Sequence, residues 1–148
     1  MANSKQPIAN GIKESIMKIT QEILDNLTAQ AKASERLRMS MDMRTSSEDQ
    51  SQRMLNAIEP GTQVPIHRHR GSAETVVVVR GRLIERLYND NGDITEEILM
   101  EAGGECPVLQ IPAGQWHGIE VFEPGTVILE AKDGSYTPIH PKDILIIK

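Results

Sequence analysis

From about residue 52 onward, the chain alternates between short apolar runs and clusters of turn-forming residues. The turn signals are Pro60-Gly61, Asn91-Gly92, Gly103-Gly104, Pro124-Gly125 and Asp133-Gly134. They separate strands that we predict at 52–58, 62–67, 73–79, 82–88, 94–100, 107–111, 116–121 and 126–131, with a short apolar tail at 144–147. Many short strands with regular turns are typical of a sandwich or barrel, and here they predict a mainly β jelly roll.

The N-terminal part of the chain follows a different, helical pattern. Ile23, Leu24, Leu27 and Ala31 recur on one helical face, and Thr20 is a suitable N-cap, so the pattern predicts a helix over 21–34. Residues 1–18 have a mixed composition, and we expect them to form a flexible N-terminal segment. Residues 19–148 then form a single domain, in which the short helical segment covers the barrel or a partner subunit.

Composition narrows the class of protein. A chain of 148 residues with 39% hydrophobic residues is long enough for one core. Its formal net charge of −5 argues against nucleic acid or an anionic membrane surface as a partner. No stretch approaches the roughly 20 apolar residues that span a bilayer, and no signal-peptide pattern is evident. We therefore expect a cytoplasmic protein, and the single cysteine, Cys106, agrees with a reducing compartment.

Two motifs carry candidate metal chemistry. Residues 61–81 read G-x5-H-x-H-x4-E-x6-G and supply His67, His69 and Glu74, and residues 112–117 read P-x-G-x2-H and supply His117. In a strand, side chains two residues apart share a face, so His67 and His69 can converge on one ion. Glu74 needs a turn before it, which Gly71 can supply.

Three imidazoles and one carboxylate suit one divalent transition metal: Fe, Mn, Ni, Cu or Zn. Because imidazole binds metal in its neutral form, affinity should weaken as pH falls through roughly 6. The competing interpretation is that the histidines are solvated loop residues and that the Gly and Pro residues only form ordinary hairpin turns.

The two motifs resemble the signature motifs of the cupin superfamily, in which the four matching residues ligate one metal ion. The resemblance implies a cupin double-stranded β-helix, which is a jelly-roll barrel, for residues 19–148. Two positions depart from the usual second motif, because Cys106 stands where a glycine opens it and Val121 where an asparagine closes it. Neither is a usual ligand position, so these departures concern local turn geometry.

Further segments over residues 18–145 resemble the WbuC family of cupin-fold metalloproteins. These segments are Arg36-Leu-Arg38, Gln52-Arg-Met-Leu-Asn56, Glu59-Pro-Gly61, Glu123-Pro-Gly-Thr126 and Glu130-Ala-Lys132-Asp-Gly134-Ser-Tyr136. The family is associated with bacterial surface-polysaccharide gene neighbourhoods and has no established reaction. Its members often carry an aromatic-His pair where this chain has Met43-Arg44.

The candidate catalytic or pocket residues are Arg53, Glu130, Lys132 and Tyr136. The last three can supply an acid, an anion contact and a phenolic donor, or else ordinary surface salt bridges. Arg53 and Asn56 lie at an odd offset, so a regular strand would point them to opposite faces. The resemblance places both in the pocket, which would require a bulge.

Two functional hypotheses follow. In the first, the protein is a metal-dependent enzyme, an isomerase, epimerase or dioxygenase-type cupin, that acts on a small anionic or sugar-derived molecule. In the second, it is a non-catalytic, metal-stabilised ligand-binding or regulatory module. Fold cannot choose between them. In either case we expect a homodimer, since the exposed edges of such a barrel are commonly paired with a second copy.

Overall fold

The computed structural model describes residues 16–147. In chain order the elements are α1 (Gln21–Ala33), β1 (Arg38–Asp42), β2 (Ser51–Ile58), β3 (Ile66–His67), β4 (Glu74–Arg80), β5 (Arg82–Tyr88), β6 (Ile94–Glu101), β7 (Val108–Ile111), β8 (Trp116–Val121), β9 (Val127–Asp133), the 3-10 turn η1 (Pro141–Asp143) and β10 (Ile144–Leu145). The flexible segment expected at 1–18 falls mostly on residues 1–15, which lie outside the described residues. Its flexibility stays a prediction.

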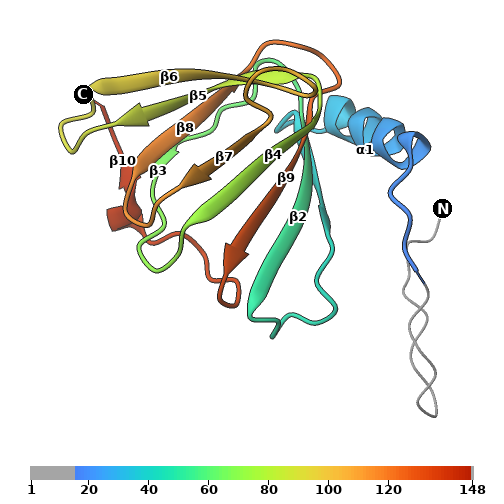
Figure 1. Cartoon of the computed structure of the whole chain (residues 1–148), viewed down its shortest axis with the longest axis horizontal. Helices are drawn as coiled ribbons and strands as arrows, with labels where there is room; N and C mark the ends of the chain where they lie inside the picture. Colours follow the sequence, from blue (N-terminus) through green and yellow to red (C-terminus); the bar gives the residue numbers. More distant parts are fainter. Residues whose placement is uncertain (1–15, 148) are drawn as a thin grey trace.

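The strands form two five-stranded antiparallel sheets, in the orders β1-β2-β9-β4-β7 and β10-β3-β8-β5-β6. Figure 1 shows the two sheets facing each other, with α1 at one edge of the molecule. The main core lies between them and joins side chains of both: Ile58, Val76, Val78, Ile111 and Ile128 from the first sheet, and Leu83, Met100 and Val121 from the second. The mainly β jelly-roll fold is thereby confirmed.

Helix α1 covers the outer side of the first sheet. The Thr20 side chain accepts a hydrogen bond from the backbone N–H of Ile23, so the expected N-cap is confirmed. The buried face of the helix packs against Leu55 and Ala57 of β2 in a second apolar cluster, whereas Asn56 and Ile58 point between the sheets. Among residues 16–147, no helix is both long and apolar enough to cross a bilayer.

Two details of the strand prediction were wrong. Strand β1 was missed because its sequence, Arg-Met-Ser-Met-Asp, lacks the β-branched and aromatic residues that favour strands. Its Met39 and Met41 nevertheless pack beside α1 in the second cluster. The strand expected at 62–67 shrinks to β3, Ile66–His67, because Pro65 has no N–H to donate to a ladder.

Gly81, the last glycine of the first motif, lets the chain pass directly from one sheet to the other. It has a φ of 82°, and an added Cβ would collide with Thr126. Thr126 is fully buried, and its hydroxyl accepts a hydrogen bond from the N–H of Arg82 at 3.3 Å. This close turn places β4 and β5 in opposite sheets, with residues of both facing the space between them.

Candidate metal centre and adjoining cavities

The structure brings the histidines of the two motifs together at one end of the barrel. His67 on β3 lies directly opposite His117 on β8, and their ring centroids are 4.4 Å apart. His69 lies in the loop that follows β3, with its ring centroid 5.0 Å from that of His67. One ring nitrogen from each histidine lies within 4.8 Å of the other two, an arrangement that could hold a metal ion.

His69 reaches the histidine cluster from a loop, and not from the strand on which we expected it. We expected His67 and His69 on one regular strand, but β3 ends at His67. The His69 carbonyl instead accepts a hydrogen bond of 2.8 Å from the N–H of Gly114, which has a φ of 84°. Gly114 of the second motif thus holds the loop of the first motif in place through this hydrogen bond.

Backbone carbonyls orient two of the three imidazoles. Nδ1 of His67 lies 2.9 Å from the Pro65 carbonyl, and Nδ1 of His117 lies 2.9 Å from the Gln115 carbonyl. A proton on Nδ1 satisfies each carbonyl and leaves the Nε2 lone pair free, the arrangement that metal-binding histidines use. Within residues 16–147, Nε2 of His69 and Nε2 of His117 are buried and make no hydrogen bond of regular geometry, although both lie near the Glu74 carboxylate.

Burial also favours the neutral form of His67. It lowers the pKa of His67 to about 4, with a further contribution from His117. This residue therefore remains neutral to a lower pH than the value of roughly 6 that we expected for metal ligands in general. A neutral imidazole is the form that binds a metal.

Glu74 supplies the carboxylate from the opposite sheet. It is buried, with Oε2 3.2 Å from Nε2 of His69 and Oε1 3.5 Å from Nε2 of His117. Lys132 lies opposite it on β9 and places Nζ 3.2 Å from Oε2. Burial by itself would raise the pKa of Glu74, but the contacts with His117, His69 and Lys132 hold it well below its usual value.

This donor set fits a transition metal. It offers three imidazoles and one ionised carboxylate, and the two buried Nε2 atoms without regular hydrogen bonds have the free lone pairs that a metal requires. With a divalent ion the set has a formal charge of +1.

An inner cavity of about 210 Å³ adjoins the histidines. Its polar lining includes Glu74, Lys132, Glu85, Glu130, Asn56 and Arg38, and much of the remaining wall is aliphatic. The amide of Asn56 donates a short hydrogen bond to Glu130 Oε1, and Ser40 donates to Asn56 at 2.5 Å. Burial and the neighbouring Glu74 raise the pKa of Glu130 to about 7.

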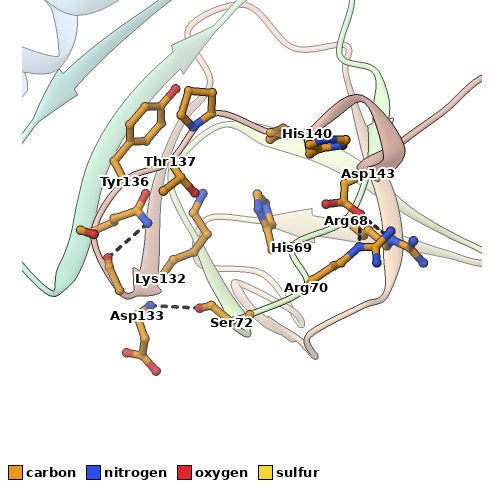
Figure 2. A pocket seen from close by; sticks show the side chains of 16 residues that line it. Arg68, His69, Arg70, Ser72, Lys132, Asp133, Tyr136, Thr137, His140 and Asp143 are labelled. Carbon is orange, nitrogen blue, oxygen red and sulfur yellow. Dashed lines mark hydrogen bonds and ion pairs between the residues drawn. The ribbon is translucent and has the colours of Figure 1, made fainter.

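An outer pocket of about 450 Å³ is larger and more open than the inner cavity (Figure 2). Its labelled side chains include Arg68, Arg70, Lys132, Tyr136 and His140. Asp143 accepts hydrogen bonds from both arginines, since its Oδ1 lies 3.0 Å from Nε of Arg68 and 2.5 Å from Nε of Arg70. The two spaces share His69, Lys132 and Ile139, so the outer pocket meets the inner cavity at these side chains.

Three of the four candidate pocket residues line the two spaces, and Arg53 does not. Glu130 lines the inner cavity, Tyr136 lines the outer pocket, and Lys132 lines both. Arg53 lines neither, because its guanidinium lies 3.2 Å from Asp49 and 2.9 Å from the Ser51 carbonyl. The pairing of β2 with both neighbours runs without a bulge, so Arg53 and Asn56 face opposite ways. The pattern-based expectation was correct here, and the resemblance-based placement of Arg53 was wrong.

Sequence reasoning missed Arg38 and Glu85 as cavity residues. Arg38 begins the strand that was not predicted. Glu85 could have been found from the sequence, because it lies two residues after Leu83 and so shares the inward face of β5 with it. A charged residue on an apolar strand face is unusual enough to single out.

Some residues of the segments that resemble the WbuC family serve the fold instead of the cavities. Glu59 is buried, and its Oε2 accepts a hydrogen bond of 2.8 Å from the N–H of Gly125. This contact joins the two Glu-Pro-Gly segments far from each other in the sequence.

Residues 19–100, more than half of the chain, match the family described as "Domain of unknown function (DUF6016)". No curated protein matches the sequence at a significant level. Among solved structures, the chain is similar to KdgF from Halomonas sp., with 15% identity and a TM-score of 0.53 over 67% of this chain and 82% of that one. It is also similar to the capsular polysaccharide assembling protein CapF from Staphylococcus aureus, with 22% identity and a TM-score of 0.60 over 78% of this chain and 33% of CapF.

A third similar structure is the cupin domain of Cnp3 from Schizosaccharomyces pombe, with 12% identity and a TM-score of 0.52 over 69% of this chain and 67% of that one. At these identities the structural likeness shows the fold alone. The chain therefore belongs to the family described as a domain of unknown function, DUF6016, and its fold is that of the cupins.

Proposed function

We propose that this protein is a metal-binding cupin that binds a small anionic or sugar-derived molecule at its metal. The observation that carries the proposal is the convergence of three imidazoles beside Glu74, with the buried Nε2 atoms of His69 and His117 near its carboxylate. His67, His69, His117 and Glu74 would hold one ion of Fe, Mn, Ni, Cu or Zn. The ion would act as a Lewis acid that polarises a carbonyl or activates water.

The chain's own residues support an anionic ligand. Lys132 lines both the outer pocket and the inner cavity, and its ammonium lies beside the candidate ligand Glu74, so an anion bound at the metal would lie close to it. This ammonium pairs with Glu74, whereas Arg68 and Arg70 pair with Asp143. Tyr136 adds a phenolic donor to the outer wall, and Glu130 adds a carboxyl to the inner one. This set suits isomerisation or epimerisation of a carbonyl-bearing molecule, in which a proton must be taken and returned.

The substrate class rests on the resemblance to WbuC-like cupins. That resemblance connects the chain with bacterial surface-polysaccharide metabolism and so favours a sugar-derived ligand. The description of CapF as a capsular polysaccharide assembling protein agrees with it, although the present chain spans only 33% of CapF. We also propose that the protein is a cytoplasmic homodimer.

Elemental analysis of purified protein tests the metal site. The wild-type chain should contain about one transition-metal ion, and His67→Ala/His69→Ala should lose metal affinity by at least about 100-fold, since two ligands are removed. His140→Ala is the matched control, because His140 lines the outer pocket and does not belong to the histidine cluster. Stoichiometric metal in the double variant would refute the ligand assignment. Turnover of sugar-derived and keto-acid substrates by the loaded protein then separates an enzyme from a binding module.

A further inference from the structure

Glu85 is the most unusual side chain in the interior. It lies in the middle of β5, is 0% exposed, and faces inward together with Leu83. Its neighbours across the sheet are Ile98 on β6 and Ile119 on β8. Both carboxyl oxygens are buried, and neither has a hydrogen-bond partner within residues 16–147.

Such a placement is costly for the folded protein. Burying a polar group without a hydrogen bond is unfavourable, and a leucine would fit the apolar neighbours of this strand position better. Buried polar groups without protein partners are rare in native proteins, and they call for a specific explanation such as a bound molecule or a functional role.

The inner cavity provides that explanation. Glu85 lines the same space of about 210 Å³ as His67, His69, His117 and Lys132. This space is below the roughly 300–1,000 Å³ of drug-sized sites, so its occupant is a small molecule. A molecule that fills the cavity beside the histidines therefore also lies against Glu85.

We propose that Glu85 determines ligand specificity by hydrogen bonding to a hydroxyl group on the small molecule whose other end lies at the histidine cluster. This inference rests on the proposed function and specifies its ligand, which carries a hydroxyl remote from its metal-binding end. Burial, with Glu74 and Glu130 nearby, raises the pKa of Glu85 to about 9. A protonated carboxyl can both donate and accept, and a hydroxyl matches both roles.

Matched pairs of metal-chelating probes test the inference by calorimetry on the zinc-loaded protein. The first pair is 4-hydroxybutanohydroxamate and pentanohydroxamate, which differ by a terminal hydroxyl in place of a methyl group. The second pair, 3-hydroxypropanohydroxamate and butanohydroxamate, is one carbon shorter. Wild-type protein should prefer the hydroxyl probe by about five-fold in at least one pair, the equivalent of one net hydrogen bond.

Three variants locate the origin of that preference. Glu85→Gln keeps a donor and an acceptor and should retain the preference. Glu85→Leu should reverse it, because a leucine offers the hydroxyl no partner. Glu96→Leu makes the same substitution at an exposed position of β6 and should behave like the wild type.

The outcomes separate the two proposals. If the protein holds metal and binds both members of each pair equally, the role of Glu85 is refuted and the metal site stands. The wild-type comparison decides this even if Glu85→Leu does not fold. If Glu85→Leu binds with the wild-type preference, Glu85 has no role in specificity. If the wild-type chain takes up no zinc and binds no hydroxamate, the proposed function fails and this inference fails with it.

Discussion

The outer pocket and the inner cavity are both rich in charged groups, but they satisfy these groups in different ways. In the outer pocket, Asp143 is bonded by Arg68 and Arg70, and the Arg70 side chain is 56% exposed. In the inner cavity, Glu74 and Glu85 are buried, and Glu85 has no hydrogen-bond partner in the described part of the chain. In Figure 2, His69 lies between Lys132 on one side and the paired arginines on the other.

The difference indicates where function resides. A partly exposed ion pair gains little because solvent screens it, so the outer arginines and Asp143 are readily explained as loop structure. A buried carboxyl interacts strongly with whatever lies beside it, and it is unfavourable when nothing does. We therefore assign ligand recognition to the inner cavity and the side chains at its entrance.

The largest difference in stability that we expect is between variants of Glu74, which pairs with Lys132, and variants of Asp143, which pairs with Arg68 and Arg70. Glu74→Gln should destabilise the metal-free protein by about 2–4 kcal/mol, because it leaves Lys132 without its buried partner. Asp143→Asn should cost less than Glu74→Gln, because the arginines that pair with Asp143 are partly exposed. Denaturant unfolding in the presence of a chelator measures both. Equal losses in the two variants would remove the distinction between the pockets.

The second contrast concerns pH. The folded-state pKa of Glu85, about 9, lies above its ordinary value of 4.5, so its contribution to stability is fully present below pH 4.5 and is lost as pH rises through 9. Glu74 and Glu130 are the carboxyls that act on it. Between pH 5 and pH 8, Glu85→Gln should therefore gain about 4 kcal/mol of stability relative to the wild type, since each pH unit is worth about 1.4 kcal/mol.

Unfolding of the metal-free wild-type protein and of Glu85→Gln across this pH range checks the expectation. Glu96→Gln provides the control, since the same change at an exposed residue should give a difference that does not vary with pH. A flat difference for Glu85→Gln as well would mean that this carboxyl is solvated in the folded protein.

The smallest difference that we expect is in anion affinity, between variants of Lys132 and of Arg70. Lys132→Met should weaken binding of malonate to the zinc-loaded protein by about five-fold, since Lys132 lies at the junction of the two spaces. Arg70→Met should change it by less than about two-fold, because the guanidinium is already bonded to Asp143. Calorimetry at two ionic strengths measures both affinities. A larger loss for Arg70→Met would place the anion in the outer pocket instead.

Much of the fold was predictable from local patterns. The cap at Thr20, the apolar face of α1 and most strands follow from residue spacing and turn residues, and these are properties of short segments. Strand β1 was not predictable in this way, because Met39 and Met41 are partly buried by a helix from another part of the chain. The candidate metal ligands were predicted as a set, but His69 is placed by the N–H of Gly114 and not by a regular strand.

The sequence alone determined the class of the protein: a mainly β jelly roll with one capped helix and two motifs that carry His67, His69, Glu74 and His117. Spacing specifies these features because hydrophobic periodicity, turn chemistry and ligand chemistry are all local. Only the tertiary structure decided which charged residues share a cavity. It placed Glu85 and Arg38 with the histidines and turned Arg53 away, because residues distant in sequence meet only when two sheets pack face to face.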